Sequence, residues 1–261
     1  MQIAITALED DRILPFRNVR DRDLRRTHDD GFLVEGEVVL PVLLGQTERP
    51  VRAILVSVAQ AERLRVILAT VPDEVPIYVA PLPLLEQIVG FPMHRGVMAL
   101  ASRGPEPALD AILSGARVVG LCGITNHDNV GGIFRNAAAF GADAVLLDGA
   151  SCDPLYRKAV RVSVGGSIVV PFAYVSDEAA MIESLTGHGY TTLALSPRGD
   201  LVIGRDAPPR NGKIALLLGA EGPGLSEATL RACTTARIEM RPGWDSLNVA
   251  ATSAIALHWL R

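Results

Sequence analysis

The sequence predicts an α/β fold with a mostly parallel sheet, on two observations. Short apolar runs rich in Val, Ile and Leu, such as Val51–Ser57, alternate along the chain with segments of helical length. Strands separated by helices form βαβ units, and strands of parallel sheets are near-continuous apolar runs. The composition agrees, because hydrophobic residues make up 49% of the 261 residues and aromatic residues only 5%. This apolar content suffices for a sizeable core or for two small domains.

The first half of the chain is expected to form a small α/β domain. Residues 10–28 carry arginines with interleaved aspartates, which predicts a polar helix with one basic face. That face is either solvated, with local ion pairs, or a contact for nucleic-acid phosphates. The other expected elements are strands Gly31–Glu35, Val51–Ser57, Ile77–Ala80 and Val97–Ser102 and helices at residues 37–45, 58–70 and 82–89.

A Pro- and Gly-containing stretch, Arg103-Gly-Pro-Glu-Pro, has the composition of a linker. We therefore place a boundary near residues 103–113, with domains at 1–105 and 106–261. A second α/β series follows. Its expected strands are residues 118–124, 144–147, 168–172, 191–195, 214–218 and 238–240, and its expected helices are residues 130–140, 154–164, 178–188, 226–233 and 249–260.

Charge and cysteine content narrow the function class. The formal net charge of −4 argues against a generic nucleic-acid binder, so any such contact must come from a local basic patch. The three cysteines form no CxxC pair, which predicts neither a disulfide framework nor a zinc site. The N-terminus does not resemble a signal peptide, and no apolar run reaches the length of a membrane span. We expect a cytoplasmic protein.

In open parallel sheets, ligands bind where strands end and helices begin, and three such junctions in the second half have unusual polar and glycine content. The first is Asn126-His-Asp-Asn-Val-Gly-Gly-Ile-Phe-Arg-Asn136. Asp128 or Asn129 is expected to cap the helix that follows. The two glycines in its first turn weaken a helix, which indicates a close approach of backbone or ligand. On local pattern alone, Arg135 is a surface or ion-paired residue.

The second junction is Leu218-Gly-Ala-Glu-Gly-Pro-Gly-Leu225, after an all-apolar strand. Its glycine spacing fits neither the dinucleotide fingerprint nor a Walker loop. A plain turn before a helix capped by Ser226 would explain it, but Glu221 is an unusual carboxylate beside a buried strand end. We expect Glu221 to accept hydrogen bonds from backbone amides of a neighbouring loop.

The third junction lies within residues 237–259. A short strand runs into a Pro-Gly turn, then a polar cluster of Asp245, Ser246 and Asn248, and then a long helix rich in small residues. Asp245 or Ser246 is expected to cap that helix.

The three loops in this order and spacing resemble the motifs of the SpoU/TrmH branch of the SPOUT RNA methyltransferases. The matching residues are Asn129, Gly131, Arg135 and Phe140-Gly141 for the first motif, Leu218 to Gly224 for the second, and Ile238, Met240 and Ser246 to Val249 for the third. Arg157, Lys158, Arg161 and Ser163-Val-Gly-Gly look like the family's segment between the first two motifs. His127 and Asp128 replace a more usual Asp/Asn-Pro at the loop tip.

The resemblance is close over residues 117–261 and looser before them. Phe32-Leu-Val-Glu-Gly and His94-Arg-Gly-Val-Met-Ala are similar to the family's small RNA-binding domain, which is like ribosomal protein L30e. The resemblance implies a C-terminal trefoil knot and a homodimer, neither of which composition or periodicity predicts. It also implies methyl transfer from S-adenosylmethionine to a ribose 2′-hydroxyl of RNA. Ribosomal RNA is favoured by the separate N-terminal domain, and tRNA is an alternative.

The resemblance also assigns roles to residues. Arg135 would orient the 2′-oxygen and stabilise its developing negative charge, because arginine is a poor base, and His127 is a weaker candidate for a base. The implied catalytic residues are Asn129, Arg135, Glu221, Ser246 and Asn248. The implied cofactor-binding residues are Leu195, Leu218, Gly219, Gly222, Gly224, Ile238, Met240 and Leu247. The implied RNA-binding residues are Arg17, Arg22, Arg25, Arg157 and Arg161. No metal is expected, since the methyl on a sulfonium is already electrophilic.

Two other functions remain open at this point. The chain could be a non-catalytic RNA-binding scaffold that uses its N-terminal half, or a methyltransferase of the same fold that acts on a base nitrogen. Binding of S-adenosylmethionine distinguishes the first, and the chemical position of the methyl group distinguishes the second.

Overall fold

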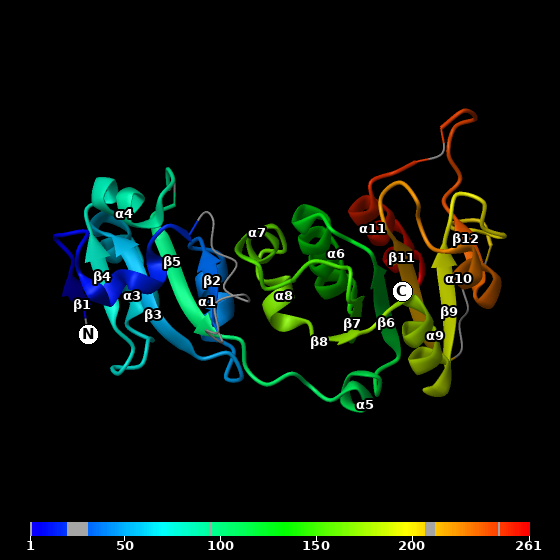
Figure 1. Cartoon of the computed structure of the whole chain (residues 1–261), viewed down its shortest axis with the longest axis horizontal. Coiled ribbons are helices and arrows are strands. Elements are labelled where there is room, and N and C mark those ends of the chain that lie inside the picture. Colours follow the sequence, from blue (N-terminus) through cyan, green and yellow to red (C-terminus); the bar gives the residue numbers. More distant parts are fainter. Residues whose placement is uncertain (1, 20–30, 94, 207–211, 245) are drawn as a thin grey trace. The chain divides into compact units, whose positions relative to one another are not determined.

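The computed structural model describes residues 2–19, 31–93, 95–206, 212–244 and 246–261. It divides the chain into two compact units, each built around a sheet (Figure 1). Unit 1 is Met1–Pro105 with Leu155–Ile168, and unit 2 is Glu106–Pro154 with Val169–Arg261. The first division falls in the expected linker. Residues 155–168 group with unit 1, although the sequence places them within the second predicted domain.

Unit 1 has a mixed sheet whose described strands lie in the order β1-β4-β3-β5-β2. β4 is parallel to β1 and β3, whereas β5 is antiparallel to β2 and β3. The strands are β1 (Gln2–Ala4), β2 (Gly31–Glu35), β3 (Val51–Ser57), β4 (Ile77–Ala80) and β5 (Val97–Ser102). The helices are the 3₁₀ helix η1 (Asp11–Phe16), α1 (Val39–Leu44), α2 (Val58–Arg63), α3 (Arg65–Leu68), α4 (Leu82–Val89) and α7 (Arg157–Val162).

The core of unit 1 is formed by apolar side chains of η1 and α4 packed with those of the sheet. Ile13 and Phe16 of η1 are fully buried. The prediction of a polar helix over residues 10–28 is therefore wrong where the structure describes it, because η1 ends at Phe16 and anchors itself through apolar residues. Residues 20–28 of that prediction lie outside the described residues.

A buried ion pair joins β2 to α7 inside unit 1. Glu35, the last residue of β2, accepts hydrogen bonds from Arg157 Nη1 and from Arg161 Nη1, the latter at 3.3 Å. The two arginines are four residues apart, so they lie on one face of α7. The side chain of Glu35 is 7% exposed and that of Arg157 is 16% exposed. The guanidinium of Arg157 also lies 4.5 Å from the centre of the Phe91 ring, a cation–π contact.

Unit 2 has a sheet whose described strands lie in the order β10-β12-β9-β11-β6-β7-β8, with every pairing parallel. The strands are β6 (Arg117–Cys122), β7 (Ala144–Asp148), β8 (Phe172–Val175), β9 (Tyr190–Leu195), β10 (Leu201–Val202), β11 (Lys213–Gly219) and β12 (Thr234–Arg237). The helices are α5 (Leu109–Ile112), α6 (His127–Phe140), α9 (Glu178–Gly187), α10 (Glu227–Ala232) and α11 (Val249–Trp259). Helix α8 (Gly166–Val169) runs across the division between the units. The predicted α/β class with a mostly parallel sheet is confirmed.

Helices α6 and α11 pack closely against each other in unit 2 (Figure 1). A Cβ added at Gly132 of α6 would lie 2.7 Å from Cβ of Ala250, so only glycine permits this approach. Asn136, one turn later, donates to the Ala250 carbonyl at 2.7 Å and to Ser253 Oγ at 2.9 Å. Helix packing therefore explains Gly132, one of the two glycines in this helix.

Three further predicted elements differ from the structure in more than their end residues. The strand expected at residues 238–240 is β12, Thr234–Arg237, because the backbone there pairs with β9 before the more apolar residues are reached. The strand expected at 168–172 begins at Phe172, after the short helix α8. The helix expected at 58–70 is interrupted at Leu64 into α2 and α3. Strands β1 and β10 were not expected. In the described part of the chain, no helix has the length and apolarity needed to cross a membrane.

Candidate active site

The candidate site lies at the carboxyl edge of the unit 2 sheet. Four neighbouring strands, β12, β9, β11 and β6, are parallel, so their carboxyl ends meet at one edge. Register places Gly219 opposite Cys122, and Ala236 opposite Leu195. The three polar loops singled out in the sequence leave the sheet at this edge.

The first loop is organised by a cap that the sequence did not predict. Asn126, not Asp128 or Asn129, caps α6, and its Oδ1 accepts from the backbone N–H of Asp128 at 2.9 Å. Helix α6 therefore starts at His127 and contains Asn129 in its first turn. Asn129 is 4% exposed. Because it does not cap the helix, its side-chain amide is available to the other loops.

The second loop folds back on itself beyond β11. Ala220 and Gly224 form an antiparallel bridge, and Gly224 N–H donates to the Ala220 carbonyl at 3.0 Å. A Cβ on Gly219 would clash with the backbone of Gly224 and Leu225, so this glycine allows the tight return. The turn presents Glu221, whose Oε1 accepts a hydrogen bond from Asn129 Nδ2. The expected partner of Glu221 was a backbone amide, and that expectation is wrong.

The third loop reaches the same point through Asn248. This residue, rather than Ser246, caps α11, since its Oδ1 accepts from the backbone N–H groups of Ala250 and Ala251 at 3.0 and 3.1 Å. Its Nδ2 donates to Asn129 Oδ1 at 2.8 Å. Asp245, the other predicted cap, lies outside the described residues.

These contacts form one directional chain, the Asn129 network, consisting of Asn248, Asn129 and Glu221. The α11 backbone donates to Asn248, Asn248 donates to Asn129, and Asn129 donates to Glu221. Each amide therefore has its oxygen and nitrogen fixed by its neighbours. The network brings together three of the five predicted catalytic residues, one from each loop.

Arg135 and Ser246 are not part of the Asn129 network. Arg135 is exposed and, among the described residues, has no hydrogen-bond partner. It lies six residues after Asn129 on α6, so the two side chains leave the helix about 120° apart. Ser246 is exposed two residues before the α11 cap. Their predicted roles in catalysis remain predictions.

The predicted cofactor-binding residues surround the strand ends, and the surface there fits an apolar ligand that needs close backbone approach. Gly222 and Gly224 have φ values of +92° and +71°, and a Cβ at either would meet nothing within 4 Å. Such open glycines leave backbone accessible. Half-buried apolar side chains lie at or beyond the same strand ends, namely Leu195, Ile238 and Met240. Leu247 is 45% exposed, whereas Leu218 is 1% exposed and packs inside the sheet.

The predicted RNA-binding arginines have varied environments. Arg157 and Arg161 are engaged with Glu35 in unit 1. Arg17 donates to the Asp10 carbonyl at 3.0 Å. Arg22 and Arg25 lie outside the described residues. Sequence patterns identify these residues as basic but do not reveal that Arg157 is mostly buried.

A separate cavity of about 900 Å³ lies between α9 and α10 and is lined by none of the predicted site residues. Its lining includes Asp177 and Glu178, which are engaged as the α9 cap and as an acceptor from Ser226 and Thr229. Over the described residues, no group of three or more His, Cys, Asp or Glu side chains could hold a metal ion. Burial raises the pKa of the Cys152 thiol to about 11 and that of Cys122 further, so neither is an activated nucleophile.

Comparison with known proteins supports the family that the motifs of these three loops resemble. Residues 116–258 match the model of the SpoU rRNA Methylase family. The chain is 37% identical over 257 residues to the uncharacterized tRNA/rRNA methyltransferase Rv0881 of Mycobacterium tuberculosis, covering 96% of this chain and 88% of that protein. It is 30% identical to the 23S rRNA (guanosine-2′-O-)-methyltransferase RlmB of Photobacterium profundum, covering 80% of this chain and 89% of that protein.

Solved structures show the same fold over the whole chain. The SpoU methyltransferase AviRb of Streptomyces viridochromogenes, in complex with the cofactor AdoMet, is 27% identical with a TM-score of 0.77 and covers 96% of this chain and 97% of that one. The AdoMet-bound rRNA methyltransferase of Sinorhizobium meliloti is 22% identical with a TM-score of 0.81, over 100% and 97% of the two chains. From the family match and the shared fold, we conclude that this chain belongs to the SpoU rRNA methylase family.

Proposed function

We propose that the protein transfers a methyl group from S-adenosylmethionine to a ribose 2′-hydroxyl of RNA, with ribosomal RNA as the substrate class. The observation that carries this proposal is the Asn129 network, in which the three family motifs meet at one edge of the sheet. The similarity to RlmB, named for guanosine 2′-O-methylation of 23S rRNA, supports the ribose as acceptor and rRNA as substrate. A tRNA substrate is the alternative.

The residues at this edge fit S-adenosylmethionine. The open backbone at Gly222 and Gly224 would admit its methionine part, and Leu195, Ile238 and Met240 offer an apolar slot for the adenine. When bound, the cofactor supplies a methyl group that is already electrophilic. The protein's own task is then to position the acceptor oxygen in line and to stabilise the negative charge that develops on it.

In this mechanism the Asn129 network holds the three loops together, and Arg135 contacts the 2′-oxygen that accepts the methyl group. The exposed guanidinium of Arg135 would donate to the 2′-oxygen and stabilise it as its proton is lost, with a phosphate of the RNA as proton acceptor. Glu221 is already the acceptor for Asn129 and Asn248 is already the α11 cap. We therefore assign Asn129, Glu221 and Asn248 a positioning role and reserve the catalytic contact for Arg135.

The test of the proposed function has two measurements. Calorimetry with S-adenosylmethionine should show binding, and incubation with rRNA from a strain lacking the gene should produce 2′-O-methylated nucleosides, detected by mass spectrometry. No heat of binding, together with retained RNA binding, would point to a scaffold. A methyl group found on a base would overturn the assignment of the acceptor.

Asn129 offers a prediction that separates positioning from simple packing. Asn129→Ala should lower kcat about 10- to 100-fold, since it removes two partly buried hydrogen bonds, together worth roughly 1–3 kcal/mol. Asn129→Asp should lower kcat at least as much, because it keeps an acceptor for Asn248 but sets a carboxylate against Glu221. Steady-state methylation of rRNA measures both variants.

The matched control for Asn129 is Asn136→Ala on the same helix. Asn136 donates hydrogen bonds to Ala250 and Ser253 of α11 and, among the described residues, forms none with Asn129, Glu221 or Asn248. It should lower stability while leaving kcat within about threefold of wild type. A fully active Asn129→Asp variant would contradict the role of the network.

We further propose a homodimer that acts in the cytoplasm. Helices α6 and α11 pack together, and each leaves small or apolar side chains in solvent, including Ala138, Ala139, Ala251 and Ile255. Exposed apolar surface of this kind is typical of an association surface. Light scattering on the purified protein tests the dimer, and a monomer at micromolar concentration would contradict it.

A further inference from the structure

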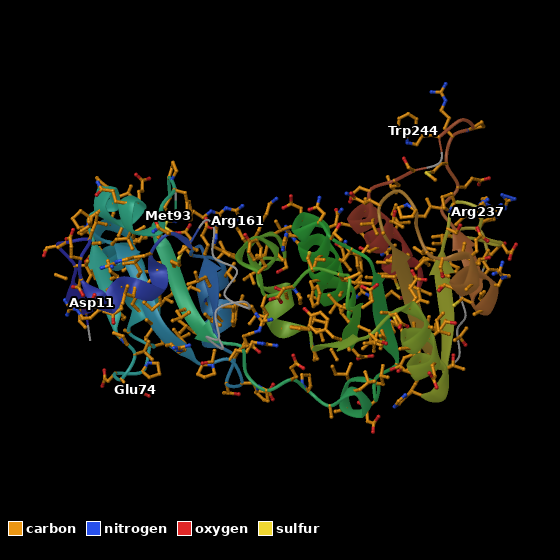
Figure 2. The ribbon with its side chains drawn as sticks, in the orientation of Figure 1. Asp11, Glu74, Met93, Arg161, Arg237 and Trp244 are labelled. Carbon is orange, nitrogen blue, oxygen red and sulfur yellow. The ribbon has the colours of Figure 1, made fainter. Side chains whose placement is uncertain are left out.

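The loop between β12 and α11 carries an exposed tryptophan that no motif explains. Trp244 is 69% exposed, and its side chain stands at the outer end of this loop in unit 2 (Figure 2). A large apolar side chain that faces solvent contributes no free energy of burial to the fold. The second tryptophan of the chain differs, since Trp259 is half-buried and its Nε1 donates to the Asp206 carbonyl at 3.1 Å.

Trp244 lies at the end of a hydrogen-bonded β-turn. Arg241-Pro-Gly-Trp244 closes with a hydrogen bond of 3.0 Å from Trp244 N–H to the Arg241 carbonyl, and Gly243 has a φ of +83°. Proline followed by a glycine with positive φ is the pattern of a type II turn. The turn therefore fixes the separation of Arg241 and Trp244, which stand at its two ends and are both exposed.

Arg241 is the one charged residue of the turn itself, and Asp245 follows the turn in the sequence. Glu239, two residues before it, forms an ion pair with Arg205 at 3.4 Å, so its charge is compensated. Arg241 adds a cation at the start of the turn. An aromatic face beside a guanidinium is the combination that binds single-stranded RNA, with the ring stacking on a base and the cation on a phosphate.

The turn also lies within reach of the Asn129 network. Trp244 is four residues before Asn248, which places their Cα atoms at most roughly 14 Å apart along an extended chain. That reach suits a nucleotide next to the one that is methylated, rather than the methylated ribose itself.

We propose that Trp244 and Arg241 form an RNA clamp, in which Trp244 stacks on a base neighbouring the methylated nucleotide and Arg241 binds the adjacent phosphate. The clamp rests on the proposed action on RNA. The third loop would then contact the RNA substrate in addition to the cofactor at the carboxyl edge of the sheet. Because an aromatic side chain stacks on a base that is not already paired and stacked in a helix, the clamp should bind single-stranded segments more tightly than paired ones.

Fluorescence titration tests the clamp in a Trp259→Phe background, where Trp244 is the remaining tryptophan. Adding a short oligo(A) single strand should quench its emission, whereas a fully paired RNA duplex of equal length should have a much smaller effect. Trp244→Ala should weaken oligo(A) binding about 5- to 100-fold and raise KM for rRNA more than it lowers kcat. Trp244→Phe should restore most of the affinity, and Arg241→Ala should reduce the salt dependence of binding.

The matched control is Val66→Ala, which trims an equally exposed apolar side chain, 71% exposed, in unit 1. If the wild type methylates rRNA and Trp244→Ala behaves like Val66→Ala, the clamp is wrong while the proposed function stands. If the wild type neither binds nor methylates RNA, the proposed function itself fails. An emission change with S-adenosylmethionine alone, with lost cofactor affinity in Trp244→Ala, would make the loop a cofactor lid. Dissociation of a dimer in that variant would make it a subunit contact, and either result overturns the clamp.

Discussion

Arg135→Ala is expected to lower kcat about 100- to 1000-fold while leaving the fold and cofactor affinity intact. Removing one preformed donor to a developing oxyanion has an effect of this size. Arg135 is exposed on α6 and, among the described residues, holds no hydrogen-bond partner, so its loss should leave the free energy of unfolding nearly unchanged. Single-turnover methylation of rRNA measures the rate, and calorimetry measures the affinity for S-adenosylmethionine.

Two variants make this expectation sharper. Arg135→Lys keeps the charge but loses the planar fork, so it should recover only part of the rate. Arg231→Ala removes an exposed arginine from α10 and should keep wild-type activity. Full activity in Arg135→Ala would remove this residue from the mechanism. Equal losses in Arg135→Ala and Arg231→Ala would indicate a general charge effect on RNA binding.

Glu35→Ala is expected to destabilise unit 1 by about 3 kcal/mol or more. It would leave the mostly buried cation of Arg157 without its carboxylate, and breaking one side of a buried pair costs roughly 3–5 kcal/mol. Arg161, at 40% side-chain exposure, can turn to solvent, so the loss should fall at the lower end of that range. Urea unfolding followed by circular dichroism measures the change.

The control for Glu35 lies in the same unit. Arg63→Ala removes the exposed partner of Glu37, an ion pair of 3.3 Å in which the side chains of Arg63 and Glu37 are 66% and 27% exposed. Because both side chains reach solvent, losing this pair should cost about 1 kcal/mol, less than losing one side of a buried pair. Glu35→Gln should fall between the two, because it keeps the shape and one acceptor but loses the charge. A Glu35→Ala variant as stable as Arg63→Ala would show that the buried pair contributes little.

The Glu35 pair also bears on RNA binding. Arg157 and Arg161 were predicted to contact RNA, and the structure engages both with a buried carboxylate. The more exposed Arg161 is the one whose head group can still reach a phosphate. Sequence alone could not separate the two, since basic residues four apart on a helix look equivalent until their partner is known.

The sequence by itself determined the elements whose apolar runs have clear ends. Strands β2, β3, β4 and β5 and helix α4 have the predicted bounds, because Gly, Pro or polar residues border each run. It also determined the family through the three loops, since their glycines and amides occur in a fixed order. Local pattern suffices for such features because they depend on residues close together in the chain.

Only the tertiary structure decided the caps, the displaced strands and the partners within the site. Asn126 and Asn248 cap their helices, although the neighbouring Asp128, Asp245 and Ser246 are equally good caps by local pattern. β12 ends before Ile238 because backbone pairing with β9 and β10, not hydropathy, sets its limits. Asn129 and Asn248 are 119 residues apart and meet because the parallel strands bring their loops to one edge of the sheet. Contacts over that separation depend on strand order, which no local pattern contains.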